Sequence, residues 1–149
     1  MTKSFTLKTA LAITMLAASA TAGGDTATEQ RIIAMKAVGG EMRILGGMAQ
    51  GNVAYDDFAA LSALETMRNA AAAAQPLFAS PPMEGEETRA MAAIWEDGSE
   101  FDAGMTALLA ALDTAIAAEP ADLASFGPLF GAVAGTCKAC HENYRAPKE

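Results

Sequence analysis

Two thiols and an imidazole lie close together near the C-terminus, in the stretch Cys137-Lys138-Ala139-Cys140-His141. On a helix, thiols three residues apart and a histidine four residues after the first thiol project from one face. The spacing Cys-x-x-Cys-His is the attachment signature of c-type haem, in which each thiol forms a thioether with a vinyl group and the histidine ligates the iron. The motif therefore predicts one covalent haem c, bound by Cys137 and Cys140 with His141 as an iron ligand.

Three other kinds of site use cysteines at this spacing. A zinc site needs four ligands, and because the chain has two cysteines and one histidine, carboxylates or a second subunit would have to complete it. A thioredoxin-like redox pair opens a helix after a strand, and no strand pattern precedes these residues. A simple disulfide would leave His141 unexplained. Haem attachment accounts for all three side chains and is the interpretation we favour.

The segment that carries the motif has the periodicity of a helix packed in a bundle, because its apolar residues alternate three and four positions apart. These residues are Leu123, Phe126, Phe130, Val133, Cys137, Cys140 and Tyr144. The two cysteines therefore belong to the face that packs against the core. Pro128 lacks an amide hydrogen, so we expect a kink or a broken first turn around Gly127-Pro128.

Three further amphipathic segments precede this one. The four predicted helices span about 26–50, 56–75, 99–119 and 122 onward. The apolar face of the second comprises Phe58, Leu61, Leu64, Met67, Ala71 and Ala74. A proline-rich connection separates the second and third helices, and a short helical piece is expected within it at 86–94. Four helices without a strand signal predict an all-α, antiparallel up-down-up-down four-helix bundle with covalently bound haem c.

Residues 1–22 have the features of a secretory signal peptide. Lys3 and Lys8 precede an apolar run, and small residues before position 23 offer cleavage sites, so we expect cleavage after Ala22 and a mature domain at 23–149. A retained membrane anchor is the alternative, although the run is shorter than the roughly 20 apolar residues that span a bilayer. Export predicts a periplasmic protein whose mature chain does not insert into the membrane.

The chain is acidic. Its formal net charge of -8 becomes -10 once Lys3 and Lys8 are removed with the signal peptide, which contains no acidic residue. This charge disfavours nucleic acid and anionic membranes as partners. It favours a basic partner, or one not held by charge. No second cluster of titratable residues accompanies the motif, so the sequence does not indicate an enzyme.

One charged residue stands at the head of the apolar face of the first helix. The face comprises Arg31, Met35, Val38, Met42, Leu45 and Ala49. Because an unpaired buried charge is costly, Arg31 must find a partner or reach solvent. A haem propionate would pair with it, and an extended side chain that reaches water is the alternative.

Taken together, these features resemble the class II cytochromes c, which comprise cytochrome c prime and its low-spin relatives. The resemblance rests on the C-terminal position of the motif, on Tyr144-Arg145 after it, on Arg31-x-x-x-Met35 and on Ala93-Ile94-Trp95-Glu96. It covers nearly all of the mature chain. Single-domain cytochromes c of the commoner kind carry the motif near the N-terminus instead.

The resemblance implies roles for individual residues. His141 would be the fifth iron ligand, and the first helix would cover the opposite haem face with Met35 at the sixth coordination position. Arg31 would pair with a haem propionate, and Arg145 would lie near the solvent-side edge of the proximal histidine. Family members are often homodimers that use their first two helices.

Two functions follow from the behaviour of Met35. If its thioether binds the iron, His/Met ligation raises the reduction potential and suits one-electron transfer with redox partner proteins. If Met35 only packs, the iron is five-coordinate and its open face binds or sequesters nitric oxide or carbon monoxide. Methionine is also a common filler of apolar gaps, so its position alone does not decide. We favour the exported electron carrier, with gas binding as the alternative.

Overall fold

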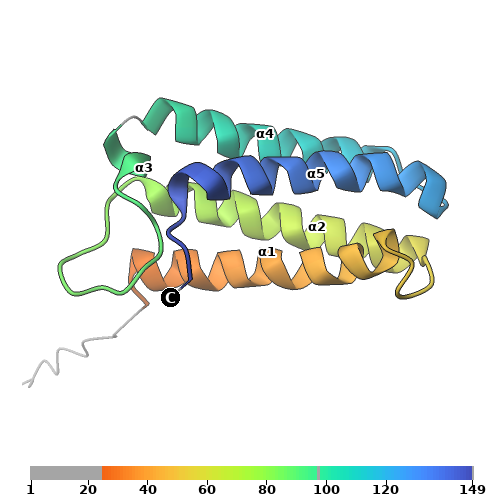
Figure 1. Ribbon diagram of the computed structural model, residues 1–149, viewed down its shortest axis with the longest axis horizontal. Helices are drawn as coiled ribbons and strands as arrows, with labels where there is room; N and C mark the ends of the chain where they lie inside the picture. The colour runs from red at the N-terminus through yellow and green to blue at the C-terminus, as the bar shows by residue number, and fades with distance from the viewer. Residues whose placement is uncertain (1–24, 97, 149) are drawn as a thin grey trace, which may run out of the picture.

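The computed structural model describes residues 25–96 and 98–148, so the signal peptide predicted at 1–22 lies outside the described part. Its long helices are α1 (Ala27–Ala49), α2 (Asp57–Ala74), α4 (Gly98–Ala117) and α5 (Leu123–Tyr144). Consecutive long helices run in opposite directions (Figure 1). Helices α1 and α4 both pack against α2 and α5. The predicted up-down-up-down four-helix bundle is therefore confirmed.

Polar caps set the starts of three long helices. Thr26, Asp56 and Asp122 each accept a hydrogen bond from the amide three residues later, at 3.2, 2.8 and 2.8 Å. Such caps satisfy amides that have no partner inside the helix, and each stabilises a helix by about 1 kcal/mol. None of the helices in 25–96 or 98–148 has the length and apolar character needed to cross a membrane.

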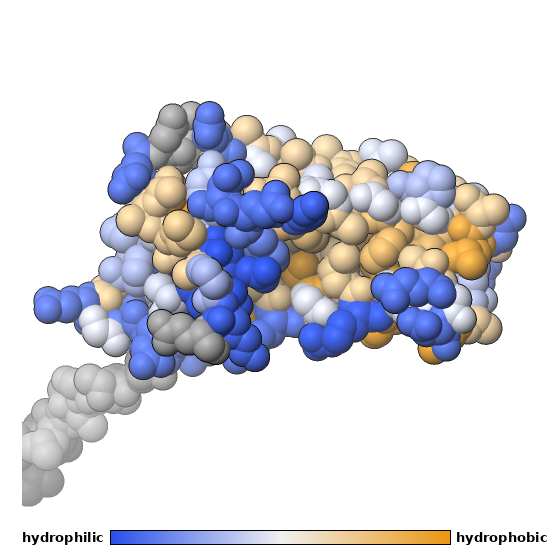
Figure 2. All heavy atoms as spheres, viewed as in Figure 1, coloured by the Kyte–Doolittle hydropathy of each residue, from blue (hydrophilic) through white to orange (hydrophobic). Residues whose placement is uncertain are grey.

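The apolar core has two parts. The larger part lies along the bundle axis, and its fully buried side chains include Leu45, Leu64, Met67, Leu112, Phe126 and Val133. The smaller part contains Ile94, Phe101 and Met105 and lies beside the haem-attachment motif, against Cys140 and Tyr144. Figure 2 shows hydrophilic residues gathered over this end of the molecule, while more apolar residues cover the other half of the same face.

Two residues predicted to face inward are exposed instead. Phe58 is 81% exposed and Leu123 is 40% exposed. Both lie in the first turn of their helices, at the end of the bundle that Tyr55 and Phe126 fill with rings 5.3 Å apart. The Tyr55 hydroxyl also donates to the Pro120 carbonyl across this end. Periodicity identified the correct face but could not show where the neighbouring helix ends.

The break expected at Pro128 is also absent, because α5 continues from Leu123 to Tyr144 without interruption. Proline removes only the hydrogen bond to the carbonyl of Ala124, and both residues are exposed, so water can replace the missing donor. Gly127 has no Cβ to clash with the proline ring. The prediction of a broken first turn was therefore wrong.

The connection between α2 and α4 differs from the prediction of a helix at 86–94. Only η1 (Gln75–Phe78) and α3 (Ala93–Glu96) are helical there. The stretch between them instead pairs with the chain after α5, because the Met91 amide donates to the Tyr144 carbonyl and the Ala146 amide donates to the Arg89 carbonyl, at 3.0 and 2.8 Å. This pairing ties the end of α5 to the connection.

Candidate functional site

Two adjoining cavities, of about 140 and 340 Å³, lie between α1, α4 and α5. Residues that line both are Met35, Met105, Cys140, His141 and Arg145. The smaller cavity extends beneath the connection, and the larger follows the bundle past Cys137. The structure therefore brings the C-terminal motif and Met35, which are about a hundred residues apart in the chain, to the same space.

Both thiols of the motif lie half-buried on α5, one turn apart. Burial raises the pKa of Cys137 and of Cys140, so both stay protonated at neutral pH. Zinc binding and thiol exchange require the thiolate. In addition, no group of three or more His, Cys, Asp or Glu side chains able to hold a metal ion occurs within the described ranges. The zinc and redox-pair alternatives therefore gain no support from the geometry.

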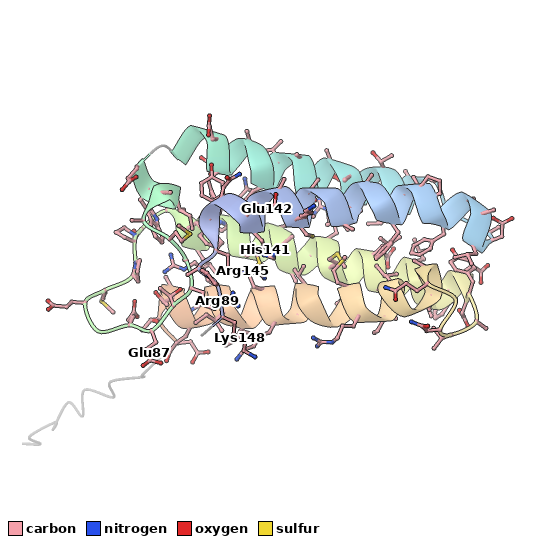
Figure 3. All side chains as sticks on the ribbon, viewed as in Figure 1. Glu87, Arg89, His141, Glu142, Arg145 and Lys148 are labelled. Atoms are coloured by element: carbon pink, nitrogen blue, oxygen red, sulfur yellow. The ribbon has the colours of Figure 1, made fainter. Side chains whose placement is uncertain are left out.

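His141 follows on the same helix and is half-buried. Burial lowers its pKa, and the positive charges of Arg145 and Arg89 lower the pKa further. The imidazole is therefore kept neutral, which is the form that ligates a metal. Arg145 Nη1 lies 3.5 Å from His141 Nε2, and Figure 3 shows His141, Arg145 and Arg89 together at this end of the molecule.

Arg31 is buried, with 3% of its surface exposed, and its main partners are not those considered from the sequence. Its Nη1 donates to the carbonyls of Leu77 and Ser80, at 3.0 and 2.8 Å. Its guanidinium also lies over the rings of Phe78 and Trp95, 5.3 and 5.4 Å from their centroids. One donor, Nε, is buried without a partner beside the smaller cavity. Arg31 thus holds the connection in place and retains one free donor.

A second link joins the connection to α1. Arg31 Nη2 donates to Thr28 Oγ1 at 2.6 Å, and the Thr28 hydroxyl donates to Glu86 Oε2, also at 2.6 Å. The Met83 amide donates to the same carboxylate oxygen at 2.8 Å. The hydrogen bond from Thr28 has the largest effect on the Glu86 carboxyl. Together these bonds lower the pKa of Glu86 and keep it ionised. No sequence pattern relates Thr28 to Glu86, so this network could not be found before the fold was known.

Met105 is the site residue whose role the sequence did not indicate. The spacing of Phe101, Met105, Leu108 and Leu112 predicts only that Met105 faces the core. It is 3% exposed and lines both cavities, as Met35 does. Two thioethers therefore border the space next to His141. Inward-facing methionines occur on three helices, as Met35 and Met42, Met67 and Met105, so the sequence alone does not show which of them border the cavity.

This geometry defines a four-helix-bundle protein with a half-buried Cys-x-x-Cys-His motif in an apolar cavity, and the comparisons with known proteins specify its family. A family profile described as Cytochrome C′ matches residues 26–145. Cytochrome c-556 of Agrobacterium tumefaciens (strain apple 185) is 32% identical over 121 residues, which are 81% of this chain and 95% of that protein.

Two solved structures have the same fold. Cytochrome c′ from Rhodopseudomonas palustris is 28% identical, with a TM-score of 0.78 over 85% of this chain and 100% of the other. A nitric oxide complex of a cytochrome c prime variant from Alcaligenes xylosoxidans is 26% identical, with a TM-score of 0.71 over 82% and 94% of the two chains. The chain belongs to the cytochrome c′ family, the class II cytochromes c. Its cofactor is one covalently bound haem c with iron.

Replacing Arg31 by leucine tests its role in holding the connection. We expect Arg31→Leu to lower the free energy of unfolding of the holoprotein by about 2–4 kcal/mol, because the Leu77 and Ser80 carbonyls and the Thr28 hydroxyl lose a charged donor. Arg43→Leu, an exposed position on the same helix, is the control and should change it by less than about 0.5 kcal/mol. Equal effects in denaturant titrations would show that Arg31 does not stabilise the connection.

Proposed function

We propose that this chain is a periplasmic one-electron carrier whose haem c is bound through Cys137 and Cys140 and ligated by His141 and Met35. The observation that carries the proposal is the shared cavity wall, in which Met35 of α1 lies on the same space as His141 of α5. His/Met ligation raises the reduction potential of a haem and suits electron transfer. The predicted signal peptide supports export.

The residues of the cavity fit a haem on three counts. Its walls are mainly apolar, as the porphyrin faces require. Two neutral thiols and a neutral imidazole border it. The unpartnered Nε of Arg31 suits one propionate, and exposed Arg145 supplies a second positive charge near His141. When bound, the haem supplies a one-electron Fe(III)/Fe(II) couple.

The chain contributes binding, orientation and exclusion of water. Two thioethers prevent loss of the cofactor, and the neutral imidazole is ready to ligate without first releasing a proton. Ile94, Phe101 and Met105 exclude water from one wall because each is at most 3% exposed. The bonds of Arg31 to the connection hold this wall against α1, which would limit the reorganisation that accompanies electron transfer.

Gas binding is the second candidate, and a specific observation supports it. Met35 is only half-buried and packs with the smaller core cluster, so its thioether can act as filler and leave the distal side open and apolar. One solved relative is itself a nitric oxide complex. If Met35 does not ligate the iron, the chain would bind nitric oxide or carbon monoxide at the sixth coordination position.

We further propose that two copies of the chain associate through α1. The family resemblance implies a homodimer that uses the first two helices. Ile33 and Ile44 are 55% and 47% exposed and lie on the same side of α1, since eleven residues make about three turns. Gly40 lies between them with open space beside it. A second helix could therefore approach this apolar face closely.

The attachment residues are tested by mass spectrometry of the exported protein. The wild type should carry the mass of the chain from residue 23 plus one haem. Cys137→Ser and Cys140→Ser should each leave one thioether, and the double variant should lose all covalent haem, because serine does not form a thioether. Ala139→Ser, an exposed change inside the motif, should retain full attachment. Covalent haem in the double variant would contradict the assignment.

The sixth ligand is tested by absorption spectra of the oxidised and reduced holoprotein, with and without carbon monoxide. We expect a low-spin wild type that binds carbon monoxide slowly. Met35→Leu should produce a high-spin spectrum and rapid uptake, because leucine fills the space without a thioether. Met105→Leu is the matched control and should stay low-spin. A high-spin wild type with rapid uptake would favour the gas-binding candidate, and a change only in Met105→Leu would make Met105 the ligand.

The dimer is tested by sedimentation velocity. The wild type should sediment as a dimer at micromolar concentration, and the double variant Ile33→Glu/Ile44→Glu as a monomer, because it places charges in an apolar interface. Met83→Glu, which changes an exposed methionine of the connection, should remain dimeric. A monomeric wild type would exclude the interface.

A further inference from the structure

An open groove of about 800 Å³ lies next to the haem cavity, between the first half of α1, the connection and the C-terminal tail. We call it the basic groove because Lys36, Arg89, Arg145 and Lys148 line it. It shares Met35, Arg89 and Arg145 with the wall of the smaller cavity. Figure 3 shows Arg89, Arg145 and Lys148 at this opening, near His141.

This concentration of positive charge is unusual for so acidic a chain. The described ranges contain eight lysines and arginines, and half of them line the basic groove, whereas the whole chain has a net charge of -8. Two acidic residues also line the groove. Glu86 points one carboxylate oxygen inward to Thr28 and the Met83 amide, and Glu87 is exposed. Positive charge therefore predominates on this surface.

The opposite end of the bundle has the reverse charge. Asp56, Asp57, Glu119 and Asp122 lie where α2 and α5 begin and α4 ends (Figure 1), and neither 50–67 nor 114–137 contains a lysine or arginine. Acidic residues also lie at the end of the bundle that carries the cavity, among them Glu84, Glu96, Glu100 and Asp102, so the positive charge is concentrated in the basic groove and does not cover that whole end. A local concentration of charge acts on an approaching charged protein within about 10 Å at physiological salt.

We infer that the basic groove docks the acidic surface of a partner protein and is the place where electrons enter and leave the haem. The cations come from α1, the connection and the tail, and all four are exposed, which suits a broad protein surface better than a small ion. Arg89 is held in place by two hydrogen bonds to the Ala146 carbonyl. This inference rests on the proposed electron-carrier function. It reverses the expectation of a basic partner that net charge alone suggested.

The test uses a plant-type ferredoxin, a small acidic iron–sulfur protein of low potential, as electron donor to the oxidised holoprotein. If the basic groove is the docking surface, the second-order rate falls as salt rises from about 10 mM to about 200 mM, because screening weakens an attraction. If net charge governs the encounter, the rate rises, because screening relieves a repulsion. A rate that rises with salt, or does not change, would overturn the inference.

Charge reversal locates the surface. The variant Lys36→Glu/Lys148→Glu should slow the low-salt rate at least about tenfold and abolish the fall with salt. Arg43→Glu changes charge on the same helix outside the groove and should alter the rate less than about twofold. Equal slowing by Arg43→Glu would show that the groove has no special role.

A measurement without electron transfer separates this inference from the proposed function. Hexacyanochromate(III), a paramagnetic and redox-inert anion, should broaden the amide signals of the basic groove in NMR spectra of the holoprotein, and Lys36→Glu should remove the effect. Broadening spread over the whole surface would contradict the inference. Tight, saturable binding of one ion would also contradict it, because that result defines a small-anion site. Failure of the electron-carrier proposal would appear instead as a high-spin spectrum with intact broadening.

Discussion

The buried guanidinium of Arg31 is the interaction on which the site depends. A buried cation costs several kcal/mol unless hydrogen bonds and nearby charge compensate it. Here the Leu77 and Ser80 carbonyls and the Thr28 hydroxyl supply the acceptors, and the Glu86 carboxylate supplies the charge. Two of the acceptors for Arg31 of α1 are therefore carbonyls of the connection, which contains little helix. As a result, the connection is held against α1 over the haem cavity.

The same end of the molecule controls the state of the attachment residues. Burial keeps both thiols protonated, and burial with two arginines keeps His141 neutral. The neutral imidazole is the form that ligates iron. The backbone pairing of the tail with 89–91 holds the end of α5, so the orientation of His141 depends on a segment more than fifty residues earlier.

The positions of the charged residues in this protein are more informative than its net charge. The acidic total describes the whole chain, whereas the lining of the basic groove has four cations and two acidic residues. Two of the carboxylates at the far end are helix caps, Asp56 and Asp122, whose position follows from the need to satisfy free amides. Local folding requirements thus account for part of the acidic charge at that end.

The sequence by itself determined the helical bundle and its family, because 3.6-residue periodicity and Cys-x-x-Cys-His are local signals. It also identified Arg31 as a charge that needs a partner. Only the tertiary structure decided which partner that is, that Met105 borders the cavity with Met35, and that Phe58 and Leu123 face solvent. These outcomes depend on where helices end and on which distant segments meet, and no periodicity within one segment contains that information.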